Sequence, residues 1–109
     1  MRATEIETVS ICATVRMGDD FLLDDLVKLV ASLVDAGWAV VEISSRRSGY
    51  VFELASPGGG RVAIRYTWEE EGGRTRHYVE VCSEAVGLSD AHAALEAVLK
   101  ALGAIESNS

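Results

Sequence analysis

Hydrophobic and polar residues alternate along residues 8–15, whose sequence is TVSICATV. The larger apolar residues of this segment fall on one side, at Val9, Ile11, Ala13 and Val15. A period of two with several β-branched residues predicts a strand. The period then changes, because leucines recur at helical intervals, at Leu22, Leu26, Leu29 and Leu33. This spacing predicts a helix whose N-cap is Asp19 or Asp20 and whose C-cap region ends at Gly37, where a left-handed residue is favoured.

Four strand-like runs follow this helix, at Trp38–Ser45, Tyr50–Ala55, Arg61–Glu69 and Arg74–Cys82. Their connections are short, polar and rich in glycine, so the runs are expected to form hairpins and hence an antiparallel meander. A second amphipathic helix is predicted near the end of the chain, with Ser89 as N-cap and its end near Gly103. Residues 106–109 are expected to form a frayed tail. The apolar positions of this second helix are Ala91, Ala94, Leu95, Val98, Leu102 and Ile105.

These elements predict one domain over residues 1–109, of the α+β class, in the order β-α-β-β-β-β-α. The antiparallel meander sheet would be covered on one face by the two helices. This order resembles that of a single TATA-binding-protein-like or helix-grip domain. The resemblance is one of topology, with no family motif, so it implies a fold and carries no function.

The alternation of residues along a strand also predicts which face of the sheet is buried. Pairing Glu69 with Arg74 in the last hairpin places the more apolar residues on one face, which the helices would cover. This core face is predicted to hold Val9, Ile11, Ala13, Val15, Val41, Ile43, Tyr50, Phe52, Leu54, Val62, Ile64, Tyr66, Trp68, Thr75, His77, Val79 and Val81. The other face, called the open face below, is predicted to hold Trp38, Val40, Glu42, Val51, Glu53, Arg61, Ala63, Arg65, Thr67, Arg74, Arg76, Tyr78, Glu80 and Cys82.

The chain has 109 residues, 49% hydrophobic and 25% charged, a composition typical of a folded domain rather than a disordered one. It is acidic, and its net charge of −7 argues against a protein that coats duplex DNA, which needs a basic field. The longest apolar stretch, 21–34, is interrupted by three charged residues, so no membrane span is predicted. Glu5 and Glu7 stand where a secretory signal would be basic and then apolar, and a cytoplasmic protein is therefore expected.

Cysteine and histidine residues form no recognisable reactive pattern in this sequence. Cys12 and Cys82 lack CxxC spacing, and a reduced pair on the sheet is expected. His77 is expected to face the core with a satisfied hydrogen bond. Because His77 and Cys82 are five residues apart on one strand, they fall on opposite faces and cannot form a nucleophile–base pair. The sequence thus predicts no enzyme, with no catalytic residue, no metal and no cofactor.

Two binding hypotheses from different classes remain open. The first is single-stranded nucleic acid on the open face, because such sites combine a basic groove with aromatic rings on which bases stack. The residues proposed for this role are Arg61, Arg65, Arg74, Arg76, Tyr78, Arg46, Arg47 and Trp38. Three glutamates predicted on the same face, Glu42, Glu53 and Glu80, would repel phosphate.

The second hypothesis is a homo-oligomeric protein-interaction module without nucleic acid. The first helix is apolar around a wider arc than one sheet contact requires, and the open face is half apolar. Either surface would suit a two-fold dimer, the commonest oligomer. A third reading is a carrier of an apolar small molecule held between sheet and helices, lined by Phe52, Tyr66 and Trp68.

Overall fold

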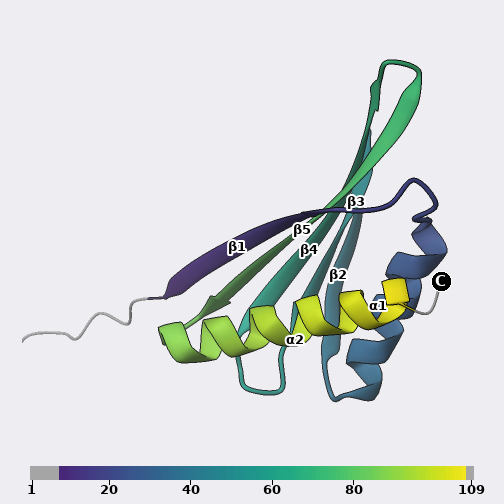
Figure 1. The fold of residues 1–109 in the computed structure, drawn as a ribbon. Coiled ribbons are helices and arrows are strands. Elements are labelled where there is room, and N and C mark those ends of the chain that lie inside the picture. Colours follow the sequence, from purple (N-terminus) through teal and green to yellow (C-terminus); the bar gives the residue numbers. More distant parts are fainter. Residues whose placement is uncertain (1–7, 108–109) are drawn as a thin grey trace, which may run out of the picture.

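The structure, a computed structural model, describes residues 8–107 and confirms the predicted α+β class. The elements are β1 (Val9–Arg16), α1 (Leu23–Asp35), β2 (Ala39–Arg46), β3 (Gly49–Ala55), β4 (Arg61–Glu71), β5 (Arg74–Ala85) and α2 (Leu88–Ser107). The five strands form one antiparallel sheet in the order β1-β5-β4-β3-β2. Both helices lie on one face of this sheet, α2 across β1 and β5 and α1 beside α2 toward β2 (Figure 1).

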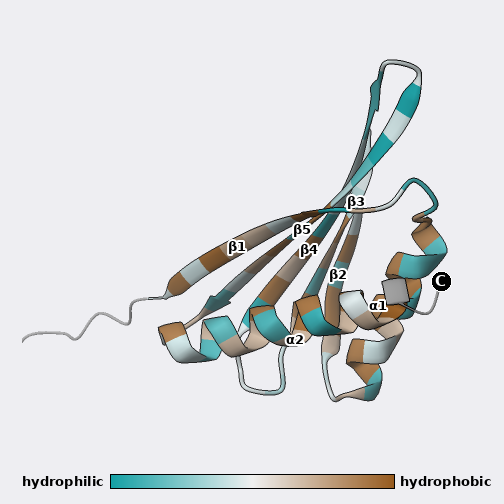
Figure 2. Ribbon diagram, in the orientation of Figure 1, coloured by the Kyte–Doolittle hydropathy of each residue, from teal (hydrophilic) through white to brown (hydrophobic). Residues whose placement is uncertain are grey.

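The hydrophobic core lies between the sheet and the two helices. Hydrophobic positions, coloured brown, recur along the strands and along both helices (Figure 2). Alternate residues of the central strands point into it, as the two-residue period predicts. Its fully buried side chains include Leu26, Leu29, Leu54, Val62, Ile64, Val79, Val81, Val98 and Leu102. No helix within residues 8–107 is both long and apolar enough to cross a membrane.

The β4–β5 hairpin has a tighter turn than predicted. Glu71, not Glu69, pairs with Arg74, so the whole register differs from the predicted one by two residues. Only Gly72 and Gly73 lie between the strands, and both have positive φ, of 60° and 80°. A two-residue turn of this kind needs glycine-like freedom at both positions and matches the twist of the strands. Because side chains alternate with a period of two, this shift left every predicted face assignment in the hairpin unchanged.

The start of β2 corrects two predicted positions. A bulge between Val40 and Glu42 places Val40 opposite Leu54, on the core side rather than the open face. Trp38 was also predicted on the open face, but it is 7% exposed and belongs to the core. Gly37 has a positive φ, of 99°, which confirms the left-handed conformation predicted after α1. The Trp38 N–H then donates to the Leu33 carbonyl at 3.0 Å.

Helix ends differ from the prediction in three places. Neither Asp19 nor Asp20 is the N-cap of α1, because that position is Leu22, whose N–H donates to Asp25 Oδ2 at 2.9 Å. Ser89 lies inside α2, since the Gly87 carbonyl accepts the first helical bond, from the Ala91 N–H at 3.0 Å. The helix then continues through Gly103. Residues 106–107, predicted to be frayed, complete α2, and 108–109 lie outside the described residues.

Candidate functional site

Five of the six arginines predicted to bind nucleic acid lie on the open face, but at separate places along it. Arg61 begins β4, whereas Arg74 and Arg76 lie on the protruding tip of the β4–β5 hairpin (Figure 1). The ten-residue length of strand between Arg61 and Glu71, the partner of Arg74, spans roughly 33 Å. Arg65 and Tyr78 lie between these two ends. The structure therefore spreads the predicted cluster along the sheet instead of concentrating it.

The remaining predicted residues add little to this face. Arg46 ends β2, and Gly49 and Thr67 lie between it and Tyr78 across the sheet. Arg47 is exposed in the turn that follows. Trp38, in the core, offers no surface for a base to stack on. Tyr78 is thus the one aromatic residue of the predicted set that remains on the face, and it is half-buried.

Carboxylates on the open face equal its arginines in number, and two of them lie close to an arginine. Glu80 lies opposite Arg65 in the register, and their charged atoms are 3.7 Å apart. Arg76 Nε lies 2.9 Å from Glu71 Oε2, a short electrostatic contact that lacks the alignment of a hydrogen bond. The registers place six arginines and six glutamates on this face. They are Arg16, Arg46, Arg61, Arg65, Arg74 and Arg76 with Glu42, Glu53, Glu69, Glu71, Glu80 and Glu84.

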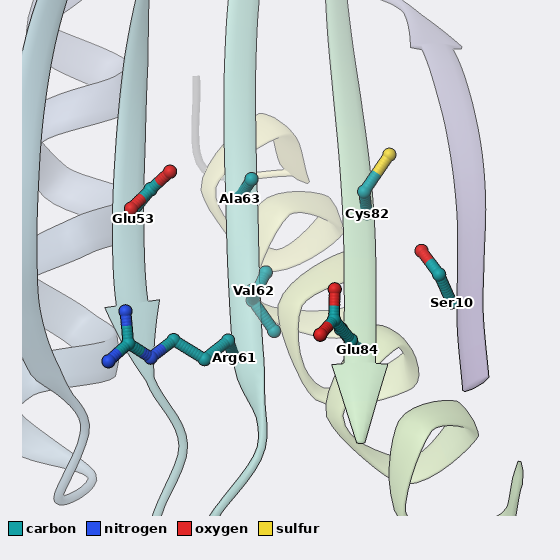
Figure 3. A pocket seen from close by; sticks show the side chains of 7 residues that line it. All are labelled: Ser10, Glu53, Arg61, Val62, Ala63, Cys82 and Glu84. Carbon is teal, nitrogen blue, oxygen red and sulfur yellow. The ribbon is translucent and has the colours of Figure 1, made fainter. Parts of the chain in front are cut away.

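A shallow depression of about 350 Å³ surrounds Arg61 at one end of the open face (Figure 3). The Arg61 side chain extends from β4 toward β3, while Glu53 and Glu84 project from the strands on either side. Ser10 and Cys82 complete the side toward β1. Two carboxylates around one guanidinium leave no net positive charge here for a phosphate. The depression is also open to solvent, unlike the enclosed pockets that bury most of a small ligand.

The two cysteines contradict the predicted reduced pair, because they form a disulfide between β1 and β5. Cys12 lies directly opposite Cys82 in the register, with the Cα atoms 4.0 Å apart. Seventy residues separate them along the chain, so only the closing of β5 onto β1 brings them together. The pairing of these two strands is a non-local contact, which no local pattern in the sequence specifies.

His77 confirms its predicted place on the core side with a satisfied ring nitrogen. The Tyr66 hydroxyl lies 2.7 Å from His77 Nδ1, and the two rings stack at a centroid distance of 5.9 Å. Burial, with a smaller contribution from Tyr50, raises the pKa of Tyr66 above its ordinary value. The phenol therefore stays protonated and can donate to the imidazole.

Aromatic rings fill the space in which an apolar ligand was predicted. Tyr66 contacts Phe21 and Trp68, each with ring centroids 5.5 Å apart, and Phe52 is 6% exposed in the same core. The depression around Arg61 is lined by none of the three residues predicted for a ligand. A second depression, of about 260 Å³, lies beside Trp38 between the 56–58 turn and α2, again away from them.

The outer edge of the sheet at β2 carries exposed apolar residues, and two of them, Val41 and Ile43, were wrongly predicted to be covered by the helices. Seven of its eight residues are exposed and the eighth, Ser44, is half-buried, whereas β3, β4 and β5 each contain buried residues. Val40, Val41 and Ile43 are 41%, 44% and 58% exposed. As the last strand of the sheet, β2 pairs only with β3 among the described residues.

Helix α1 extends this apolar character beside β2 (Figure 2). Its inner stripe is buried, but Leu23, Val27 and Val34 on its outer side are 37%, 52% and 44% exposed. These three residues follow helical spacing, so they share one side of the helix. The wide apolar arc noted in the sequence is therefore only partly used by the core. We refer to these residues of α1, with Val40, Val41 and Ile43, as the β2/α1 edge.

Comparison with known proteins adds no function to these surfaces, since the chain matches no protein-family model and no curated protein sequence. Within the part of the chain that the structure describes, no three histidine, cysteine or acidic side chains converge as a metal site would require.

Proposed function

We propose that this chain is a non-catalytic protein-interaction module that associates with copies of itself through the β2/α1 edge. One observation carries the proposal: β2 is an outer strand with no buried residue, although three of its exposed residues are large and aliphatic. An outer strand presents unpaired backbone N–H and C=O groups, which template pairing with another chain. Burying exposed aliphatic side chains supplies the accompanying hydrophobic gain.

The open face gives nucleic-acid binding, the alternative to this proposal, little support. Single-stranded nucleic acid is bound by a basic groove with stacking rings. Here glutamates equal the arginines in number, and two arginine–glutamate pairs lie close together. The indole of Trp38, which was expected to stack on a base, lies in the core. Exposed cross-strand ion pairs are a common way to solvate a sheet face. Nucleic-acid binding stays a prediction, with the weaker support.

The proposal is tested by the mass of the protein in solution as its concentration rises from micromolar to near-millimolar. We expect the wild-type mass to increase, as measured by sedimentation equilibrium or light scattering. Ile43→Lys should return the protein to a monomer, because it places a charge in the middle of the β2/α1 edge. A constant monomer mass for the wild type would contradict the proposal.

Val86→Lys is the matched control for this substitution. Val86 is also an aliphatic residue, 67% exposed, but it lies between β5 and α2, away from β2. Self-association should survive Val86→Lys and be lost in Ile43→Lys, while both variants keep the wild-type circular dichroism. Equal loss in the two variants would assign the association to general hydrophobicity and not to this edge.

A further inference from the structure

We infer that two copies pair through antiparallel β2 strands about a two-fold axis at Ser44. This inference rests on the proposed function and specifies its geometry. Such pairing would join the two sheets edge to edge, with their open faces on one side and their helices on the other, because opposed residues in an antiparallel pair share a face. Three features of β2 favour this register. They are the extent of its regular segment, the positions of its charged residues, and a glutamate that has no counter-charge in its own chain.

The bulge in β2 limits the length of strand that can pair. Its register with β3 shifts between Val40 and Glu42 and then continues without interruption to Arg46. A bulge bends its strand and disrupts the ladder, which is one of the ways an edge is protected from pairing. The regular part of the edge is therefore Glu42–Arg46, and its midpoint is Ser44. A two-fold axis at Ser44 uses this entire segment in both copies.

The charges of β2 match this register. With Ser44 opposite its own copy, Glu42 lies opposite Arg46 of the second copy, and the same pair recurs on the other side of the axis. Both residues lie on the open face, so their side chains point the same way. An axis at Glu42 would oppose two carboxylates, and an axis at Ile43 would place Glu42 opposite serine. Opposite charges directly across a pair of strands are favourable, and like charges are unfavourable.

Glu42 also lacks a counter-charge within its own chain. The residue opposite it on β3 is Glu53, a second carboxylate. Among the described residues, Glu42 forms no ion pair. A guanidinium from the second copy would reduce this repulsion. On the core side of the same segment, Ile43 would lie opposite Ser45 and diagonally near the second Ile43, within reach of a long aliphatic side chain.

Cysteine trapping tests the position of the axis. Ser44→Cys should form a covalent dimer on mild oxidation, because residues at the axis face their own copy at a distance that a disulfide spans. Ser45→Cys is the control, since it would face Ile43 and lie too far from its own copy. The native cysteines are already joined to each other and should not contribute. Trapping by Ile43→Cys in place of Ser44→Cys would overturn the Ser44 register.

Charge reversal provides a second, non-covalent test. Glu42→Arg and Arg46→Glu should each weaken dimerisation, by about two- to thirtyfold for two symmetric pairs, and the double variant should recover most of the affinity. Sedimentation equilibrium measures all three proteins. A wild type that stays monomeric would contradict the proposed function itself. A wild type that dimerises, with neither trapping at Ser44 nor recovery in the double variant, would leave that function standing and overturn this geometry.

Discussion

Tyr66 and His77 form a part-buried polar pair on the core side of the sheet, with a titratable side chain at each end. Tyr66 is 4% exposed, and its hydroxyl would lack a partner without the His77 ring nitrogen. An unpaired buried hydroxyl is costly, which explains why a histidine is favourable beside Tyr66 on this mostly apolar face. The sequence indicated the histidine's position from alternation alone, but not its partner, because the partner depends on the register between β4 and β5.

The raised pKa of Tyr66 makes the stability of the fold depend on pH in the alkaline range. In the unfolded chain a tyrosine ionises near pH 10, whereas burial raises its pKa in the folded protein. The stability gained from the buried neutral phenol is therefore complete below about pH 10 and is lost as the pH rises through the folded pKa. We expect Tyr66→Phe to be less stable than wild type near neutral pH, with a difference that shrinks above about pH 10.

Urea denaturation of both proteins across this pH range measures the difference. Tyr78→Phe is a useful control, since Tyr78 is also a half-buried tyrosine but lies on the open face. If the wild-type and Tyr66→Phe free energies of unfolding declined in parallel, the ionisation of Tyr66 would not be the cause.

At the scale of elements, the sequence predicted all seven helices and strands and most face assignments, because both depend on local periodicity. The register of the last hairpin was wrong by two residues, since a glycine-rich turn permits more than one length. The faces of Trp38 and Val40 were wrong because one helix turn and one bulge change the alternation locally. The sequence predicted only part of the exposed β2/α1 edge. The apolar arc of α1 is visible in its sequence, but the exposure of β2 follows from its place at the end of the strand order, which local patterns do not specify.

The disulfide between Cys12 and Cys82 fastens the outer strand β1 to β5 at the edge opposite β2. It joins residues 70 positions apart, and a native disulfide typically stabilises a fold by roughly 2–4 kcal/mol. We expect the reduced protein, and the Cys12→Ser/Cys82→Ser double variant, to unfold at lower urea concentration than the oxidised protein. Addition of reductant to the double variant should change nothing further. Equal urea midpoints for the wild-type protein with and without reductant would show that the disulfide does not form in solution.

At the scale of the whole molecule, the described part of the open face carries equal numbers of arginines and glutamates. The net charge of −7 arises largely from acidic clusters near the start of α1 and around the β4–β5 turn. The sheet then divides into an open face with matched charges, a core face under the helices, and the β2/α1 edge, where aliphatic side chains reach solvent. A protein that associates with itself benefits from such a net charge, because it limits nonspecific aggregation while specific contacts form at one edge.

The same charge distribution determines what we expect with nucleic acid. Affinity for a polyanion grows with the number of phosphates that cationic side chains neutralise, and it falls steeply as salt is added. Because glutamates equal the arginines of the open face in number, binding there would displace ion pairs such as Arg65–Glu80 in exchange for phosphate contacts. We expect labelled single-stranded DNA and RNA to show no salt-sensitive rise in fluorescence anisotropy, even at low salt. Salt-sensitive binding that was abolished by Arg65→Glu and Arg76→Glu, but retained in Ile43→Lys, would move the function from the β2/α1 edge to the open face.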